Sequence, residues 1–169
     1  YASRETKMMD RILEPELMDD PLQAEAYARA DFAEENQGFI DCFKEYFPDF
    51  SEGRVLDLGC GPADIPIRFA KLYPACQVIG VDASVPMIRL GEQAVQQAGL
   101  ADRITLRCER FDAVPGARIA DAAMCNSLLH HLPNPLQLWH KLRLLVKPGS
   151  PVLVMDLLRP DSLEEAQAI

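Results

Sequence analysis

From residue 54 onward, short apolar runs alternate with helical segments, and this alternation constrains the fold of the chain most strongly. The runs predicted to be strands are residues 54–59, 76–84 and 103–111, the start of 119–132, and part of 147–160. The segments predicted to be helices between them are residues 64–73, 84–99 and 135–146. Near-continuous apolar strands joined by helices are typical of a parallel sheet with both faces covered. The predicted fold class is therefore α/β, a doubly wound and mostly parallel sheet with helices on both faces.

The chain is predicted to be a single domain in which an N-terminal helical arm or cap, residues 1–47, precedes the α/β part, residues 48–169. Helical spacing covers residues 22–47 in two pieces that meet around Gly38. One face of the second piece carries an aromatic residue at every fourth position and is expected in the core: Phe39, Phe43 and Phe47.

Local signals refine the helices of the α/β part. Asp64 and Ser84 stand at the starts of two predicted helices, where their side chains are suited to capping the first turn. The helix at 135–146 has an apolar face predicted to be buried, with Leu136, Trp139, Leu142 and Val146, widened by Leu138 and Leu145. The third and fourth predicted strands are joined by too few residues for a regular helix, so this crossover is expected to be irregular.

Charge and composition exclude several classes of partner. The formal net charge of −9 repels phosphate backbones and predicts no nucleic-acid partner. No apolar run approaches the ~20 residues that a membrane-spanning helix needs, which predicts no membrane partner. The five cysteines are odd in number and none belongs to a Cys-x-x-Cys pair, so a reducing, cytoplasmic environment is expected.

A glycine-containing turn directly follows the first predicted strand. Gly59 and Gly61 let the backbone take dihedral angles closed to other residues and let a ligand approach closely. A dinucleotide-binding turn would need a third glycine at the position of Asp64. A carboxylate there competes with phosphate for the helix N-terminus, so a pyrophosphate site is rejected. The turn is then either purely structural or the seat of a different ligand.

A carboxylate ends the second predicted strand, at Asp82. A carboxylate in this place can accept hydrogen bonds from both hydroxyls of a ribose. The alternative is a loop aspartate that caps the next helix, but Ser84 is already available as that cap. The ribose role is therefore favoured.

Three stretches together carry a resemblance to a known family: "VLDLGCGPADIPIRFA", "GVDAS" and "DAAMCNSLLHHL…LVKPGSPVLVMDLLRP". In this order and spacing the chain resembles the class I S-adenosylmethionine-dependent methyltransferases, and most of all their small-molecule branch. The resemblance covers roughly residues 25–160. It implies S-adenosyl-L-methionine as cofactor, S-adenosyl-L-homocysteine as product and a small-molecule acceptor.

The resemblance also implies which residues surround the methionine end of the cofactor. Asp57 would orient the turn and lie near the amino group. The backbone of the turn would face the methionine part at Gly59, Cys60 and Gly61. Backbone or side chains near the transferred methyl group would come from Asn126, Ser127 and Leu128. Tyr27 resembles an aromatic residue that closes over the cofactor.

At the adenosine end the resemblance is less regular. Asp82 would bind the ribose, and Ala83 and Met87 would lie beside the adenine. After the third strand the family commonly has an aspartate before the residue that flanks the adenine, whereas this chain has Arg110 and Phe111. Phe111 can stack on the ring, but an arginine cannot accept a hydrogen bond from the adenine amino group. Two nearby carboxylates remain candidates for that bond: Glu109 and Asp112.

His130 and His131 follow the fourth predicted strand, close to the expected position of the methyl group. Imidazole can take a proton near neutral pH, so both are candidate catalytic residues. The alternative is packing against the following helix and contact with solvent. A metal site that adds His140 fits no ligand spacing, so no metal is predicted. Asp156 and Arg159 follow the fifth predicted strand, and two roles are open to them, contact with the acceptor and a surface ion pair, of which the ion pair is favoured.

The family normally continues past the fifth strand with another helix and two strands, whereas this chain ends at Ile169. Truncation, a natural short form and an edge borrowed from a partner all fit this difference. An open sheet edge favours association, so a homo-oligomer through that edge is one expectation.

The predicted function is methyl transfer from S-adenosyl-L-methionine to an unidentified small molecule. The alternative is a non-catalytic cofactor-binding or partner subunit that keeps the fold. A nucleophilic hydrolase and a nucleoside-triphosphatase are disfavoured, because the sequence has neither a Gly-x-Ser-x-Gly elbow nor a phosphate-binding loop.

Overall fold

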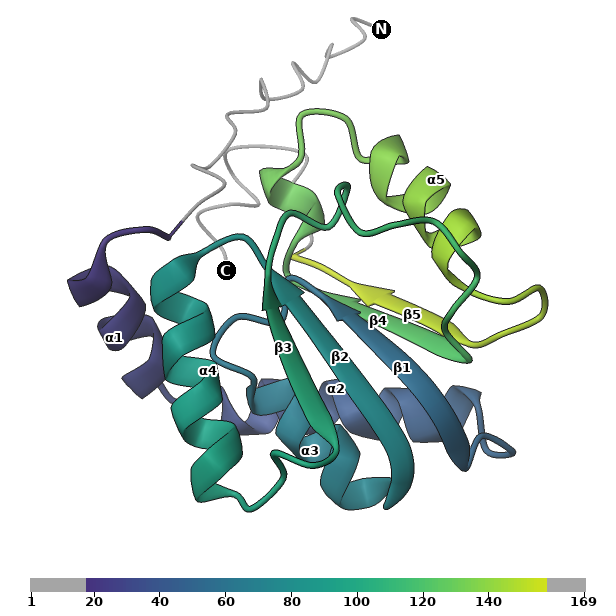
Figure 1. The fold of residues 1–169 in the computed structure, drawn as a ribbon, viewed down its shortest axis with the longest axis horizontal. Coiled ribbons are helices and arrows are strands. Elements are labelled where there is room, and N and C mark those ends of the chain that lie inside the picture. Colours follow the sequence, from purple (N-terminus) through teal and green to yellow (C-terminus); the bar gives the residue numbers. More distant parts are fainter. Residues whose placement is uncertain (1–17, 158–169) are drawn as a thin grey trace, which may run out of the picture.

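The computed structural model describes residues 18–157. Its elements, drawn in Figure 1, are α1 (Pro21–Arg29), α2 (Ala33–Tyr46), β1 (Glu52–Leu58), α3 (Asp64–Leu72), β2 (Ala75–Asp82), α4 (Val85–Gln97), β3 (Ile104–Cys108), β4 (Ala122–Asn126), the short 3₁₀ helix η1 (Leu129–His131), α5 (Leu136–Leu145) and β5 (Val152–Met155). Strands and helices alternate from β1 onward as predicted. The predicted arm lies partly outside the described residues.

The five strands form one sheet in the order β3-β2-β1-β4-β5, and all neighbouring strands are parallel (Figure 1). Because the strands are parallel, their carboxyl ends lie along one edge of the sheet. The chain moves outward from β1 through β2 to β3, and then returns to the other side of β1 for β4 and β5. This reversal places a topological switch point between β1 and β4, where ligands bind in such sheets. The α/β fold class is confirmed.

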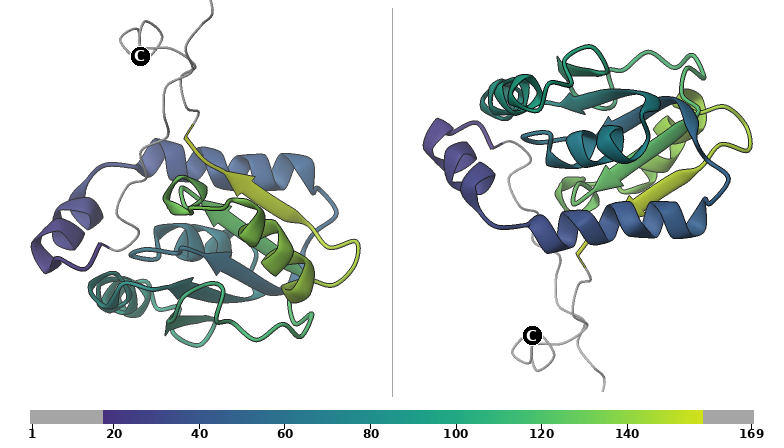
Figure 2. Two further views of the ribbon diagram at one scale, coloured as in Figure 1. Left: turned by 90° about the horizontal axis from the view of Figure 1, so that it is seen from above. Right: turned by 90° about the horizontal axis from the view of Figure 1, so that it is seen from below.

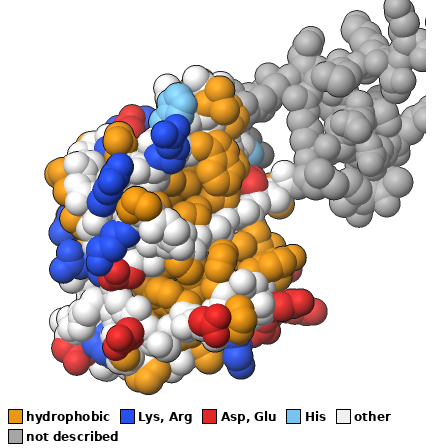
Figure 3. All heavy atoms as spheres, turned by 90° about the vertical axis from the view of Figure 1, so that its right-hand side faces the viewer, with side chains coloured by type: hydrophobic (Ala, Val, Ile, Leu, Met, Phe, Trp, Pro, Cys, Tyr) orange, Lys and Arg blue, Asp and Glu red, His pale blue; other side chains and the backbone are white. Residues whose placement is uncertain are grey.

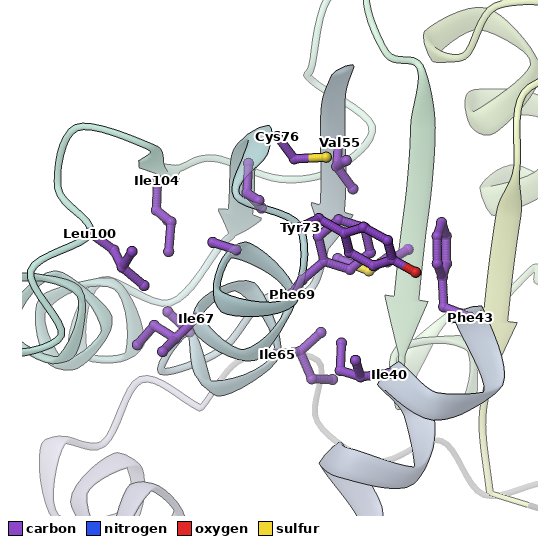
Figure 4. Packing of buried hydrophobic residues seen from close by; sticks show 14 of the residues in the cluster. Ile40, Phe43, Val55, Ile65, Ile67, Phe69, Tyr73, Cys76, Leu100 and Ile104 are labelled. Atoms are coloured by element: carbon purple, nitrogen blue, oxygen red, sulfur yellow. The ribbon is translucent and has the colours of Figure 1, made fainter. Parts of the chain in front are cut away.

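One face of the sheet is covered by α2, α3 and α4. Phe43 of α2 packs edge-on against Phe69 of α3, with ring centroids 5.0 Å apart, and Phe69 lies against Tyr73 (Figure 4). Phe39 and Phe43 are buried and Phe47 is partly buried against them, so the predicted aromatic stripe is a core stripe. Such burial is worth about 1.5–3 kcal/mol for each aromatic side chain.

The opposite face is covered by α5 and by the segment that joins β3 to β4 (Figure 2). This segment contains no helix, as expected, and it is anchored by the buried side chains of Phe111 and Val114. The third strand is shorter than predicted and ends at Cys108. An isolated parallel bridge between Ala120 and Val146 precedes β4.

The break between the first two helices lies at residues 30–32 rather than at Gly38, which was the expected position. Gly38 lies inside α2 and is exposed. A glycine inside a helix costs only about 1 kcal/mol, which tertiary packing can override. The actual break has an extended Ala30 and an Asp31 side chain that accepts a hydrogen bond from the amide of Ala33. The helical interpretation was right and its internal boundary was wrong.

Of the two predicted helix caps, one is confirmed and the other is wrong. Ser84 caps α4 as predicted, because its Oγ accepts a hydrogen bond from the amide of Met87. Asp64 does not cap α3. The N-cap is Ala63, in a left-handed conformation, and the Asp64 carboxylate instead accepts hydrogen bonds from Asn36 and Arg68. A long-range partner has outcompeted the local cap.

The predicted buried face of α5 was wrong for two of its four central members, and it was right for Leu138 and Leu145, which were expected to widen it. Leu136 and Trp139 are 60% and 44% exposed, whereas Leu138, Leu142 and Leu145 are buried against the sheet. Several leucines on one helix allow two overlapping apolar faces, and periodicity alone did not choose between them. Figure 3 shows hydrophobic side chains gathered on the side of the molecule that carries α5 and β5. None of the helices within residues 18–157 has the length and apolar character needed to cross a membrane.

Candidate functional site

A cleft of about 900 Å³ opens at the carboxyl edge of the sheet, above the switch point, and is called the main cleft below. It brings together all but two of the predicted site residues: Tyr27, Gly59, Gly61, Asp82, Ala83, Met87, Arg110, Phe111, Asn126, Ser127, Leu128, His130 and His131. Its described lining also includes residues that the sequence analysis did not single out for a site: Met18, Gln23, Phe32, Glu35, Asn36, Gly38, Cys42, Val81, Ser84, Met155, Asp156 and Leu157. Asp57 and Cys60 lie behind this lining.

The turn after β1 is held by the end of β2. The amides of Gly59 and Cys60 both donate to the carbonyl of Val81, over 2.8 and 3.0 Å, and the amide of Gly61 donates to Asp82. All three N–H groups are therefore engaged within the protein. What the turn leaves open beside Gly61 is a backbone surface with nothing close to it.

Both glycines of the turn have positive φ angles, +78° at Gly59 and +50° at Gly61. A Cβ added to Gly61 would meet nothing within 4 Å, so the space beside this residue is open. A Cβ added to Gly59 would come to 3.3 Å from Leu128. Because both residues lack a Cβ, the backbone can adopt these φ angles and a ligand can approach the turn closely. Cys60 is buried and fills the space that the missing Cβ of Gly80 leaves.

Asp57 is buried in the sheet behind the turn, with 1% of its surface exposed. Its Oδ2 atom has no hydrogen-bond partner among the described residues. Burial, and secondarily the neighbouring charge of Asp82, raise the pKa of Asp57 to about 7. An unpaired buried carboxyl oxygen is costly and rare, and it marks a place where a donor from outside the chain would be favourable.

Asp82 lies at the end of β2 and holds two backbone groups at once. Its Oδ2 accepts from the amide of Gly61 over 2.9 Å, and its Oδ1 accepts from the amide of Ser84 over 2.8 Å. Burial raises the pKa of Asp82, while these backbone hydrogen bonds oppose the rise. The side chain therefore has a structural role, and it also lines the main cleft, where its remaining lone pairs face a ligand.

Beyond Asp82, the cleft is bounded by Ala83, Met87 and the segment after β3. Phe111 is 5% exposed and presents part of its ring to the cleft. The Arg110 guanidinium forms an ion pair of 3.2 Å with Asp112. The other candidate carboxylate pairs with an arginine as well, since Glu109 lies 3.7 Å from Arg107. Neither carboxylate lines the main cleft.

On the other side of the switch point, the residues after β4 form the opposite wall. Ser127 has a φ of +56°, and its amide donates to the carbonyl of Met155 at the end of β5. A non-glycine residue in the left-handed region costs about 1–2 kcal/mol, so this turn is strained. The left-handed conformation of Ser127 turns the chain from β4 toward η1 at the cleft. The sequence did not predict this turn.

The two histidines of η1 stack on each other, with ring centroids 4.0 Å apart. Nδ1 of His130 lies 2.7 Å from Oδ1 of Asp156. The expected surface ion pair of Asp156 with Arg159 stays a prediction, because Arg159 lies outside the described residues. Among the described residues, the Nδ1 atom of His131 is buried without a hydrogen-bond partner.

Tyr27 and Phe32 form an aromatic pair at the mouth of the main cleft, with centroids 5.0 Å apart. Burial and the nearby Asp82 raise the pKa of the Tyr27 hydroxyl. The same pair borders a smaller neighbouring cleft of about 350 Å³, which also contains Asp64 and Arg68. The pair thus lies between the two clefts. Phe32 and Asn36 escaped prediction because only the fold brings them to the switch point.

A sequence profile described as "Methyltransferase domain" matches residues 55–149. A demethylmenaquinone methyltransferase from Lactiplantibacillus plantarum is 34% identical over 113 residues, which cover 66% of this chain and 48% of that protein. The chain spans about half the length of the curated relatives it matches.

Solved structures share the fold at low sequence identity. A SAM-dependent methyltransferase from Geobacter sulfurreducens, in complex with S-adenosyl-L-homocysteine, superposes with a TM-score of 0.64 at 20% identity and covers 78% of this chain and 52% of that one. The [4+2]-cyclase SpnF superposes with a TM-score of 0.66 at 22% identity and covers 85% of this chain and 50% of that one. The profile spans more than half of the chain and includes β1 with its glycine turn, so the chain belongs to the methyltransferase-domain family.

Proposed function

We propose that this chain binds S-adenosyl-L-methionine in the main cleft and transfers its methyl group to a small-molecule acceptor. The observation that carries the proposal is the pairing of the open turn at Gly61 with the carboxylate of Asp82 at the switch point. The unpartnered Oδ2 of Asp57 behind the turn supports it. Membership of the methyltransferase-domain family and the fold shared with a complex of S-adenosyl-L-homocysteine support the same cofactor.

The residues present fit such a cofactor. Asp57 offers a buried acceptor that suits the cationic amino group of the methionine part. The turn at Gly61 offers a backbone surface with open space beside it. Asp82 offers lone pairs to the ribose hydroxyls, and the apolar side chains of Met87 and Phe111 offer surfaces for the adenine. The pairing of Arg110 with Asp112 leaves that arginine at the margin of the adenine position.

The acceptor would lie on the opposite side of the cleft, against Leu128, His130 and Met155. When bound, the sulfonium supplies an activated methyl carbon, and the electron pair of the broken carbon–sulfur bond stays on sulfur. The protein then has to hold the acceptor in line and exclude water. The apolar side chains in this wall favour a largely uncharged acceptor. The relative from Lactiplantibacillus plantarum, whose name refers to demethylmenaquinone, is consistent with that class.

Calorimetric titration with S-adenosyl-L-homocysteine tests the cofactor assignment. Saturable one-to-one binding is expected. A second assay follows tritium from S-adenosyl-L-[methyl-³H]methionine into a small-molecule extract. No binding would contradict the cofactor assignment, and binding without any labelled product would contradict catalysis by this chain.

A non-catalytic cofactor-binding role is the second candidate. It is favoured by one finding: the [4+2]-cyclase SpnF shares this fold, so the fold by itself does not require methyl transfer. The tritium assay separates the two candidates, since only a methyltransferase consumes the labelled cofactor.

A further inference from the structure

The carboxylate of Asp156 is fixed by three contacts at the wall of the main cleft. Its Oδ2 accepts from the backbone amide of His130 over 3.3 Å, and its Oδ1 accepts from the amide of Leu157 over 2.7 Å. The same Oδ1 lies 2.7 Å from Nδ1 of the His130 ring. Only 13% of the Asp156 side chain is exposed. Two backbone donors therefore set the position of the carboxylate independently of the imidazole.

Neighbouring parallel strands bring the two residues together. Asn126 of β4 is in register with Met155 of β5, so the residues that follow these strands emerge side by side at the carboxyl edge. The amide of Ser127 then donates to the carbonyl of Met155 and fastens the two strand ends to each other. The paired ends of β4 and β5 therefore bring His130 and Asp156 together.

The contact determines which ring nitrogen of His130 carries the proton. A carboxylate can only accept a hydrogen bond, so Nδ1 must donate to Asp156. In the neutral imidazole the lone pair then resides on Nε2. The ring of His131 lies against the His130 ring, with centroids 4.0 Å apart and an interplanar angle of 42°. His130, His131 and Asp156 all line the main cleft.

We propose that Asp156 is a positioning residue that holds His130 as the base for an acceptor whose reacting atom carries a proton, such as a phenol or an alcohol. This inference rests on the proposed function and narrows its acceptor class. The His130 Nε2 takes the proton from the acceptor O–H bond, whose electron pair stays on oxygen. The imidazole becomes an imidazolium that is stabilised by the Asp156 carboxylate, and it later returns the proton to solvent.

Nitrogen NMR of histidine-labelled protein tests the positioning without any acceptor. In the wild-type protein, the expected spectrum of the neutral His130 imidazole shows the proton on Nδ1. Asp156→Ala should shift His130 toward the Nε2-protonated form, whereas Asp41→Asn, which removes an exposed carboxylate on α2, should leave the tautomer unchanged. The proposal is wrong if the neutral His130 of the wild-type protein is protonated at Nε2. It is also wrong if Asp156→Ala leaves the tautomer of His130 unchanged.

Methyl transfer tests the role of the base. With S-adenosyl-L-[methyl-³H]methionine and a panel of phenols, alcohols and amines, Asp156→Ala and His130→Ala should each lower labelling of the hydroxyl acceptors about 100-fold. Affinity for S-adenosyl-L-homocysteine should remain within about twofold of wild type, which separates this role from cofactor binding. Asp156→Asn, which keeps size and most hydrogen bonds, serves if the alanine variant does not fold. Unchanged labelling in these variants would overturn the proposal, and an inactive wild-type protein would instead refute the proposed function and this inference with it.

Discussion

The amide of Gly61 donates a hydrogen bond of 2.9 Å to Oδ2 of Asp82, which ties the turn after β1 to the end of β2. This bond fixes the distance between the turn and the carboxylate before any ligand arrives. A ligand that reaches both residues therefore meets a preformed site, which lowers the entropic cost of binding. The same bond gives Asp82 a structural role beside its proposed role in binding, and experiments have to separate the two.

Asp82→Ala should lower the affinity for S-adenosyl-L-homocysteine about 10- to 100-fold, because hydrogen bonds to a charged group contribute about 1.5–3 kcal/mol. Calorimetric titration measures the change. Asp102→Ala, which removes an exposed carboxylate before β3, is the matched control and should bind as wild type does. Thermal unfolding of both variants shows whether the turn has loosened. Equal affinity in a folded Asp82→Ala protein would refute the ribose assignment.

Binding of S-adenosyl-L-homocysteine should release a proton from Asp57. The pKa of about 7 leaves this buried carboxyl mostly protonated at about pH 6. A cationic amino group placed beside it favours the carboxylate, so up to one proton leaves on binding. Titrations at about pH 6 in two buffers of different ionisation enthalpy measure that proton. Asp57→Asn should abolish the release, and a release that persists in the variant would assign the proton to another group.

Two glycines inside helices should respond in opposite directions to substitution by alanine. Gly38 of α2 has nothing within 4 Å of an added Cβ, so Gly38→Ala should stabilise the protein by about 0.5–1 kcal/mol. An added Cβ on Gly91 of α4 would come to 2.8 Å from Leu106 and 3.3 Å from the Pro62 backbone, so Gly91→Ala should destabilise it by about 1–3 kcal/mol. Urea denaturation measures both. The same sign for both variants would contradict the packing described.

The two apolar faces of α5 give a further test. Leu138 is fully buried, and Leu138→Ala should cost about 2–5 kcal/mol. Leu136 is 60% exposed, and Leu136→Ala should change stability by less than about 0.5 kcal/mol. Denaturant midpoints of the two variants give the comparison. A larger loss at Leu136 than at Leu138 would contradict the burial of α5 described here.

The sequence was sufficient for the sheet and for the centre of the cleft. The strands around Gly59 and Asp82 are almost wholly apolar and end at residues with distinctive chemistry, so strand, turn and carboxylate could be located together. Each of these features is formed by residues that are adjacent in the chain, so each can be recognised from a single sequence.

The errors concern contacts between distant segments. Asp64 caps nothing because Asn36, 28 residues earlier in the chain, donates to its carboxylate, as does Arg68 one turn along the same helix. Asp156 looked like a surface residue, and only the β4–β5 register brings it to His130. Phe32 reaches the cleft because the chain turns between α1 and α2. The sequence-based prediction put this break at Gly38 instead of residues 30–32. Each error follows from long-range packing that overrides a local preference.

A crystal structure of the protein grown with excess S-adenosyl-L-homocysteine would show whether the main cleft holds this compound. We expect the ribose hydroxyls within hydrogen-bond distance of Asp82, the amino group beside Asp57 and the sulfur facing the wall that contains His130. A main cleft that stays empty, or a ligand seated instead in the smaller cleft beside Arg68, would contradict this expectation.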